Sequence, residues 1–472
     1  MTDSDGLKAA ETKMREADQP DEAIRSFRSA YERLVSGESA MLPSAELEPA
    51  GDVDIFDQLP GADPQILDYV AVIKLNGGLA TTMGLRSPKS LVEARDGKSF
   101  LEIIVGQTLA LRKRHGVRLP LVLMDSEATR EDTLRALEAS GELGLSAAPG
   151  GGALSDDGLS VDFLQSMVPK LDAEKLAPIR WEKEPALEWN PPGHGDVYPA
   201  LRGSGMLDAL LGRGFRYAMI SNADNLGATT EARIAAHMEQ NEIPFLMEVV
   251  IGTEADRKGG HIARRKEDGQ LVLRETAQTP KEDEESFRDY RRWRYYNTNS
   301  LWVDLRVLAE MLDETGGVLE LPLIVNRKTV DPRDKSSPAV IQLESAMGAA
   351  IGSFKGAQML CVPRTRFAPV KTTDDLLVLR SDAYTLSEDD MVVAPVPERA
   401  DNLPYVELDS DFYKLLDDFE RRFPDGPPSL REAERLIVHG DVTFGRGVRV
   451  RGAVELEAAE PMRIDPETTL EG

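Results

Sequence analysis

The sequence has one cysteine, no long apolar run and a shortage of positive charge. Cys361 stands alone among 472 residues, so neither an intramolecular disulfide nor a zinc site built from several cysteines is available. No stretch of about 18 consecutive apolar residues occurs, so we expect no transmembrane helix. The 56 Lys and Arg residues are outnumbered by 82 Asp and Glu residues, and the net charge of −26 disfavours binding to nucleic acid or to an anionic membrane. A site for an anionic ligand must therefore gather its positive charge locally.

The length of the chain and the changes in amino-acid composition along it predict three domains. Residues 1–65 are expected to form an N-terminal helical segment, helical from 7 to about 36, followed by an irregular connector with several prolines. Residues 66–385 form the main domain, and residues 386–472 form a linker with a C-terminal domain. The polar, acidic first residues do not look like a secretory signal, so a cytoplasmic protein is expected.

The most informative stretch runs from Val70 to Ser90. It begins with an apolar run rich in Val and Ile, typical of a buried strand, and turns at Gly77-Gly78. Pro88-Lys89 follows, and a helical pattern begins near Ser99 and ends near Gly116. A strand, a glycine loop, a basic residue and a helix are how many proteins hold a nucleotide phosphate. Neither the Walker spacing nor the dinucleotide glycine pattern is present, so this is a phosphate loop of another kind.

Further buried strands are expected near residues 119–124, 215–220 and 245–251, alternating with helices. This alternation predicts an α/β fold with a mixed, mainly parallel sheet and helices on both faces. Ligands of such sheets bind beyond the carboxyl ends of the strands. The loop at Gly77 and the segment at Asn222 both follow strands, so we expect them to face one crevice.

The C-terminal part shows a six-residue period. Leu436, Val442, Val448 and Val454 are spaced six residues apart, with glycines between them. This period is typical of a parallel β-helix, which usually packs against another part of the protein. A small antiparallel sheet is the alternative interpretation.

Two polar residues, one after a strand and one in a glycine-flanked turn, are candidates for binding or catalysis. Asp224, in Asn222-Ala223-Asp224-Asn225, would hold Mg²⁺ together with substrate phosphate oxygens, or serve only as an Asx-turn or helix cap. His194 lies between two glycines in a turn and would donate to a phosphate or a base carbonyl, although a lone loop histidine is usually inert.

Three other polar groups have both a functional and an ordinary interpretation. The amides of Asn297 and Asn299 suit sugar hydroxyls, or simply a polar strand edge. Glu275 would accept a hydrogen bond from a hydroxyl, yet an isolated Glu is normally on the surface. Lys371 follows a short apolar stretch and would reach a phosphate as a compact charge, or be an ordinary solvated lysine.

Taken together, these motifs resemble those of the eukaryotic-type UTP–glucose-1-phosphate uridylyltransferases, also called UDP-glucose pyrophosphorylases. The matching motifs appear in family order over residues 70–385, and residues 440–445 extend the likeness into the tail. They are Leu75-Asn76-Gly77-Gly78-Leu79, Met83-Gly84, Pro88-Lys89-Ser90, Pro191-Pro192-Gly193-His194-Gly195-Asp196, Asn222 with Asp224-Asn225, Lys258-Gly259-Gly260, Asn297-Thr298-Asn299 with Leu301-Trp302, and Pro369-Val370-Lys371 with Asp375-Leu376-Leu377.

The resemblance implies a Rossmann-like nucleotidyltransferase domain with a C-terminal left-handed parallel β-helix. It also implies roles for individual residues. Lys89, Lys371 and His194 would be catalytic, and Asp224 would hold the metal. The nucleotide would contact Leu75, Asn76, Gly77, Gly78, Lys89, Gln165, Gly193 and Asn222. The sugar phosphate would contact His194, Asn222, Asp224, Glu275, Asn297, Asn299 and Lys371.

The implied reaction joins UTP and glucose 1-phosphate to give UDP-glucose and pyrophosphate, with Mg²⁺ as cofactor. An oxygen of the sugar phosphate would attack the α-phosphorus of UTP in line, aided by Lys89, Lys371, His194 and the metal as local positive charges. The implied partners are these small molecules, and a homo-oligomer would form through the C-terminal domain. Two alternatives are a UTP-dependent enzyme for another sugar 1-phosphate, of N-acetylglucosamine or galactose, and a non-catalytic nucleotide-sugar-binding homologue.

One departure from the family pattern has a conformational consequence. Ala80 stands where these enzymes usually have a glycine. If the backbone there needs a positive φ, alanine costs on the order of 1 kcal/mol, and otherwise the change is harmless.

Overall fold

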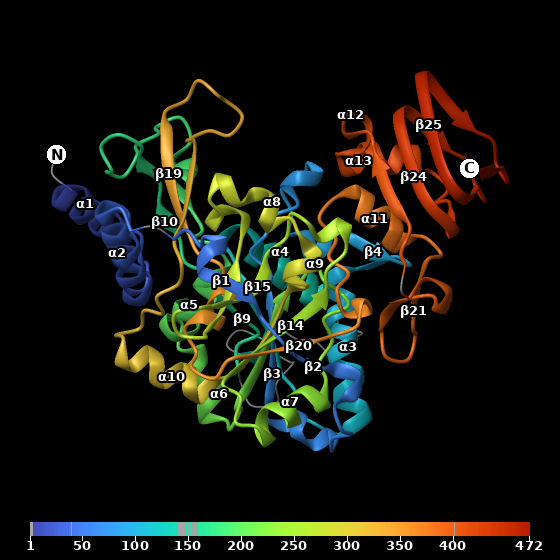
Figure 1. Ribbon diagram of the computed structural model, residues 1–472. Helices are drawn as coiled ribbons and strands as arrows, with labels where there is room; N and C mark the ends of the chain where they lie inside the picture. The colour runs from blue at the N-terminus through green and yellow to red at the C-terminus, as the bar shows by residue number, and fades with distance from the viewer. Residues whose placement is uncertain (1–2, 39, 140–146, 149–150, 153–158, 401) are drawn as a thin grey trace.

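A mixed, mainly parallel sheet forms the centre of the molecule (Figure 1). The computed structural model describes residues 3–38, 40–139, 147–148, 151–152, 159–400 and 402–472. Among the neighbouring strands of this sheet that are named next, β17 alone is antiparallel to its neighbours. The strands in spatial order are β2 (Asp54–Ile55), β20 (Gln358–Cys361), β14 (Phe245–Ile251), β17 (Tyr295–Asp304), β13 (Tyr217–Asn222), β3 (Val70–Leu75), β6 (Leu121–Asp125) and β9 (Asp162–Leu164).

Helices cover both faces of this sheet, as predicted. Alternate side chains of β3 enter two separate apolar cores, with Val70 and Val72 in one and Ala71 and Ile73 in the other. This alternation follows from the two-residue period of a strand, and it explains why β3 is apolar along its length. The first core includes residues of α3 (Phe100–His115), α4 (Glu127–Ala139), α7 (Ala232–Gln240) and α11 (Thr373–Arg380); the second includes α5 (Val197–Gly203), α6 (Met206–Gly212) and α10 (Leu305–Glu314).

The helix after the glycine loop begins and ends as predicted. Ser99 and Glu102 form a reciprocal capping box at the start of α3, which satisfies two backbone N–H groups. At the other end Gly116 has φ 66°, a left-handed conformation that glycine adopts without strain. Local sequence therefore determines both ends of this helix.

The N-terminal segment forms two helices where a single helical stretch was expected. α1 (Asp3–Glu16) and α2 (Asp21–Ser36) are separated at Pro20, which has no N–H to continue the first helix. Their apolar side chains pack with residues of β10 (Val168–Pro169) and β19 (Ala339–Glu344). The expected connector is not wholly irregular, because β1 (Leu47–Pro49) pairs with β15 (His261–Arg265) and β2 pairs with β20.

The C-terminal strands are parallel. Their order is β23 (Tyr405–Leu408), β24 (Ser429–Phe444), β25 (Arg449–Ile464) and β26 (Thr469–Glu471). The predicted six-residue positions Leu436, Val442, Val448 and Val454 are all buried. The antiparallel alternative is therefore wrong. This sheet and the N-terminal helices lie on opposite sides of the central body in Figure 1.

Shorter elements complete the chain. Within the described residues, no helix combines the length and the apolarity needed to cross a membrane. The remaining strands and helices are β4 (Glu93–Arg95), β5 (Lys98–Ser99), β7 (Ala147–Ala148), β8 (Gly151–Gly152), β11 (Leu171–Asp172), β12 (Trp189–Asn190), β16 (Leu271–Arg274), β18 (Ile324–Thr329), β21 (Tyr384–Leu386), β22 (Val393–Pro395), α8 (Glu284–Phe287), α9 (Tyr290–Trp293), α12 (Ser410–Tyr413) and α13 (Leu416–Arg422).

Candidate functional site

A crevice opens at the carboxyl ends of four adjacent parallel strands. Asn222 at the end of β13 is in register with Leu75 of β3, which is in register with Met124 of β6. Gln165 directly follows the neighbouring β9. The crevice spans about 760 Å³, solvent at its mouth included, which is the size of a small-molecule site. It is lined by Leu75, Asn76, Gly77, Gly78, Lys89, Ser90, Met124, Gln165, Pro191, Gly193, His194, Asn222, Ala223 and Asp224.

The glycine loop, residues 76–80, lies under the side chain of Gln165. A Cβ on Gly77 would come within 2.6 Å of Gln165 Oε1, so only glycine leaves room for this amide. The hydroxyl of Ser126, directly before α4, donates to the carbonyl oxygen of Gly77 at 3.0 Å. Ala80 has φ −77°, so alanine is unstrained at this position.

The side chain of Asn76 is directed into the protein. Its Nδ2 donates to Asp125 Oδ1 at 2.6 Å and to Thr133 Oγ1 at 2.9 Å, and only 3% of the residue is exposed. The backbone carbonyl of Asp125 also accepts a hydrogen bond from the N–H of Gln165 at 2.7 Å. Asp125 therefore joins the glycine loop to Gln165. Its carboxyl is fully buried, and burial raises its pKa to about 7.

His194 is a neutral hydrogen-bond donor in this structure. The Met347 N–H donates to its Nδ1 at 3.0 Å, so the ring proton is on Nε2. Burial lowers the pKa of His194 to about 4. The hydrogen bond to Nδ1 contradicts the positive charge that the sequence led us to expect at His194. Gly193 before it has φ 80°, and a Cβ there would collide with the Ser345 carbonyl.

Lys89 and Asp224 form an ion pair across the crevice. Lys89 Nζ lies 2.7 Å from Asp224 Oδ2, and both side chains are mostly buried. The other carboxylate oxygen, Oδ1, is buried and has no hydrogen-bond partner among the described residues. An unpaired buried carboxylate oxygen can accept a cation that brings its remaining ligands with it.

Glu275, Asn297, Asn299 and Lys371 are not among the residues that line this crevice. Asn297 and Asn299 are in an asparagine bulge, residues 297–299, where β17 shifts register against β14. Asn297 Nδ2 donates to Asn299 Oδ1 at 2.9 Å, and the Asn299 N–H donates back to Asn297 Oδ1 at 2.8 Å. Asn299 has φ 55°, and a bulge with this strained backbone is common next to binding sites.

Lys371 lies between Glu275 and the crevice residue Asp224. The N–H of Val370 donates to the Asp224 carbonyl at 3.1 Å, so Lys371 begins beside Asp224. Burial raises the pKa of Glu275 to about 7, and the positive charge of Lys371 opposes this rise. Glu275 lies against Gly260, where a Cβ would collide with its carboxylate. Gly260 belongs to the Lys258-Gly259-Gly260 motif, so this motif makes room for Glu275.

Sequence reasoning missed several polar residues beneath the site. Lys74 lies inside the apolar strand β3 and is 2% exposed, while Glu248 lies inside the apolar strand β14 and is fully buried. Asp125 and Arg366 are buried as well. A charged residue within an apolar run was the available signal, because such a residue must find a partner in the interior. No cluster of three or more His, Cys, Asp or Glu residues suited to a metal occurs among the described residues.

Comparison with known proteins gives one consistent family. The family model described as UTP–glucose-1-phosphate uridylyltransferase matches residues 24–451. The enzyme of that name from Hordeum vulgare is 37% identical over 471 residues, covering 98% of this chain and 94% of its own length. The one from Saccharomyces cerevisiae is 37% identical over 401 residues, covering 84% of this chain and 76% of its own.

Solved structures agree over almost the full length. The UDP-glucose pyrophosphorylase from Leishmania major superposes with a TM-score of 0.91 at 42% identity, covering 99% of this chain and 98% of its own. A mutant of that protein in complex with UDP-glucose gives the same values. A UDP-glucose phosphorylase from Trypanosoma brucei has a TM-score of 0.89 at 40% identity, covering 99% and 98%.

Proposed function

Because the chain belongs to the UTP–glucose-1-phosphate uridylyltransferase family, we propose that the crevice beyond β3, β6, β9 and β13 is its active site. The enzyme joins UTP and glucose 1-phosphate to give UDP-glucose and pyrophosphate. The observation that carries the assignment of the site is the convergence of ten predicted residues in one crevice. They are Leu75, Asn76, Gly77, Gly78, Lys89, Gln165, Gly193, His194, Asn222 and Asp224.

The reaction requires alignment and charge more than acid–base chemistry. A phosphate oxygen of glucose 1-phosphate forms a bond to the α-phosphorus of UTP while the bond from that phosphorus to the bridging oxygen breaks. Pyrophosphate leaves with the electron pair. The attacking phosphate is already ionised near pH 7, so no general base is needed. Lys89 and Lys371 offset the charge of the two anions, and His194 donates from Nε2 as a neutral group.

Asp224 is the residue we assign to Mg²⁺. Its buried Oδ1 has no partner among the described residues, which fits a cation that takes most of its other ligands from water and substrate phosphates. When bound, the metal would supply positive charge to the phosphate oxygens. In Asp224→Asn, we expect the Mg²⁺ concentration for half-maximal activity to rise about tenfold. An unchanged titration would show that Asp224 is only a turn residue.

The two ends of the product would be recognised by different elements. Gln165 over Gly77 would read the uracil, because an amide offers both a donor and an acceptor. Glu275 and the asparagine bulge would contact the sugar hydroxyls. Support for this assignment comes from the proximity of Glu275 to Lys371, whose backbone neighbour is hydrogen-bonded to Asp224.

Pyrophosphate release from the purified protein tests this function. The assay compares UTP with ATP, and glucose 1-phosphate with the 1-phosphates of galactose and N-acetylglucosamine. We expect release only with UTP and glucose 1-phosphate. Release with another sugar would overturn the sugar assignment, and no release with any pair would point to a non-catalytic homologue.

The C-terminal strands are proposed to be turns of a left-handed parallel β-helix. Leu436 of β24 pairs with Val454 of β25, and this offset of 454 − 436 = 18 residues equals three six-residue steps. An experimental structure would show the hand of these turns. A homo-oligomer through this domain is proposed as well, because β26 is the last strand of its sheet and leaves an edge for pairing. Multi-angle light scattering would measure the mass.

A further inference from the structure

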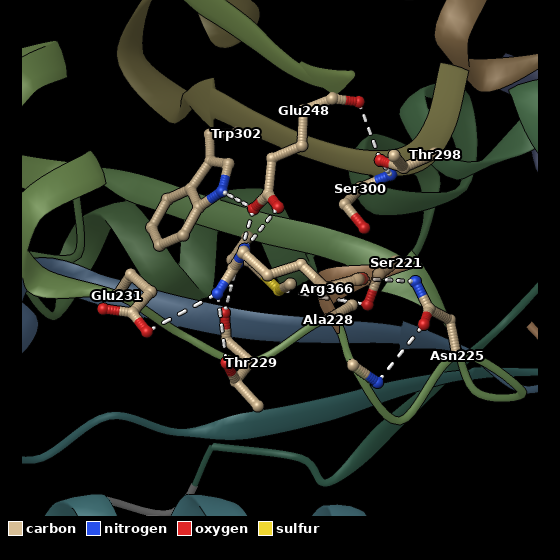
Figure 2. Close-up of polar contacts among 12 residues, drawn as sticks. Ser221, Asn225, Ala228, Thr229, Glu231, Glu248, Thr298, Ser300, Trp302 and Arg366 are labelled. Atoms are coloured by element: carbon tan, nitrogen blue, oxygen red, sulfur yellow. Dashed lines mark hydrogen bonds and ion pairs between the residues drawn. The ribbon is translucent and has the colours of Figure 1, made fainter. Parts of the chain in front are cut away.

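A buried ion pair lies beneath the active site, between Glu248 and Arg366. Glu248 is fully buried on β14, and Arg366 is 5% exposed at the end of the short helix 364–366. Arg366 Nε donates to Glu248 Oε2 at 2.8 Å, and Nη2 donates to Oε1 at 2.7 Å. Figure 2 shows the Glu248 carboxylate between Arg366 and the indole of Trp302, whose Nε1 donates to Oε1 at 2.9 Å.

Stability alone gives no reason for such a pair. Removing two charges from water costs several kcal/mol for each ion, and apolar residues of similar volume are often as stable. A bidentate pair does, however, fix the direction and separation of the elements that carry it.

The pair contacts three segments that carry proposed active-site residues. Arg366 begins the Lys371 segment, residues 366–371. Its guanidinium donates to the carbonyl of Thr229 at 2.8 Å and to the Thr229 hydroxyl at 3.1 Å. Thr229 directly follows the Asp224 turn, which we define as residues 222–228. The backbone carbonyl of Glu248 accepts from Thr298 Oγ1, in the asparagine bulge, at 2.7 Å.

Two further buried side chains complete the connection. Asn225 Oδ1 accepts from the Ala368 N–H at 3.0 Å and from the Gly227 N–H at 3.2 Å. Its Nδ2 donates to the Arg366 carbonyl at 3.2 Å, and Figure 2 shows Asn225 beside Arg366. Lys74 Nζ donates to Ser221 Oγ at 2.7 Å and to the Ala228 carbonyl at 2.9 Å. The amino group of Lys74 therefore holds together the residues at the two ends of the Asp224 turn.

We propose that Arg366 and Glu248 are positioning residues of the uridylyl transfer. The pair sets the separation between Lys371, the Asp224 turn and the asparagine bulge, and it reaches the reaction only through them. This inference rests on the proposed active site. A misplacement of about 1 Å in reacting groups can reduce the rate about 100-fold, so exact separation of these segments has a large effect.

Arg366→Lys tests the inference while keeping the positive charge. A single ammonium cannot replace the two parallel bonds to Glu248 together with those to Thr229. We expect kcat to fall 10- to 100-fold and the KM for UTP to change less than threefold, because the glycine loop and Gln165 are held by Asp125 instead. An unchanged kcat, or a loss confined to KM, would overturn the inference.

Arg216→Lys is the matched control. Arg216 Nε lies 3.2 Å from Asp304 Oδ2, and this pair joins the residue before β13 to the last residue of β17, at the end of the sheet opposite to the crevice. We expect its kcat to equal that of the unchanged chain. An equal loss in both variants would show that any arginine–carboxylate pair on this sheet matters, which would overturn a specific positioning role.

A double-variant cycle separates positioning from a general structural effect. If Arg366 acts through Lys371, then Arg366→Lys combined with Lys371→Ala loses much less activity than the product of the two single losses. Independent, multiplicative losses would contradict the inference. Activity in the unchanged chain is required first, and its absence would refute the proposed function rather than the positioning role.

A milder variant keeps the test decisive if Arg366→Lys fails to fold. Thr229→Val removes only the hydroxyl that accepts from Arg366, and both charges of the buried pair stay in place. We expect it to lower kcat while the KM for UTP stays within threefold. A folded Thr229→Val protein with an unchanged kcat would overturn the inference.

Discussion

At the scale of single residues, burial sets the charge state of several groups in and around the proposed active site. Burial holds His194 neutral and raises the pKa of Glu275 and of Asp125 to about 7. Near neutral pH, Asp125 and Glu275 therefore keep a proton that exposed carboxyl groups would have lost, so part of the charge of the site changes near pH 7.

Lys371→Ala is expected to reduce kcat about 100- to 1,000-fold. The lysine would stabilise charge that develops in the transition state, and losses of this size follow removal of one such contact. Its side chain is exposed, so the free energy of unfolding should change by less than about 0.5 kcal/mol. Steady-state kinetics and urea unfolding measure both. Lys355→Ala, exposed before β20 at the other end of the sheet, is the control and should be fully active.

Glu275→Gln is expected to change how stability depends on pH. The unfolded carboxyl ionises near 4.5 and the folded one near 7, so between these values only the unfolded state loses its proton. The free energy of unfolding of the unchanged chain therefore falls as pH rises through this window, and the glutamine variant lacks this fall. The difference between them should grow by at most about 3 kcal/mol. Urea unfolding at pH 5, 6, 7 and 8 tests this, and a constant difference would contradict it.

Sequence identified which residues meet in the crevice but not what each side chain does there. Lys89, Asp224 and His194 follow strands or glycine turns, and such local signals were sufficient to find them. That Lys89 pairs with Asp224, or that His194 is neutral, depends on neighbours distant in the chain. Asn76 was found by its motif, yet its side chain bonds Asp125, which no local pattern indicates.

At the scale of elements, strands were more predictable than their pairing. The apolar runs at 70–75 and 245–251 became β3 and β14, because buried strands need apolar side chains on both faces. The asparagine bulge was not predictable, since it arises from the register of β17 against β14. Likewise, the break between α1 and α2 shows Pro20 acting against a helical period that otherwise continues.

Two glycines next to the crevice should respond differently to alanine. At Gly193 the backbone has φ 80° and the added Cβ would meet a carbonyl, so we expect a loss of about 1–3 kcal/mol in stability and at least a tenfold fall in kcat. At Gly77 the Cβ would meet the flexible side chain of Gln165. That variant should keep its stability and raise the KM for UTP. Kinetics and thermal unfolding distinguish them, and equal effects would contradict this account.

At the scale of the whole molecule, the C-terminal sheet shares its core with the main domain. Leu436 and Phe444 of β24 belong to the same apolar cluster as Val72 of β3 and Phe100 of α3. The N–H of Leu408 in β23 also donates to Asp374, in the first turn of α11. Because α11 begins two residues after Lys371, the C-terminal sheet supports the helix that follows the Lys371 segment.

This shared core predicts cooperative unfolding of the two parts. In calorimetry we expect the main domain and the C-terminal sheet to melt in one transition, because separating them would expose apolar surface on both. Asp382→Ala removes acceptors for the N–H groups of Leu430 and Arg431, and should lower that single transition temperature. Two separated transitions in the unchanged chain would contradict the prediction.

The ion pair between Lys89 and Asp224 also affects how substrates arrive. Because these charges cancel, the pair adds no net charge to the crevice, while the whole protein carries a charge of −26. At a distance, UTP therefore meets repulsion rather than attraction. Dissolved salt screens that repulsion over about 10 Å at 0.1 M. Moderate ionic strength should thus speed the capture of nucleotide, the reverse of what electrostatic steering gives to proteins that attract their anionic ligands.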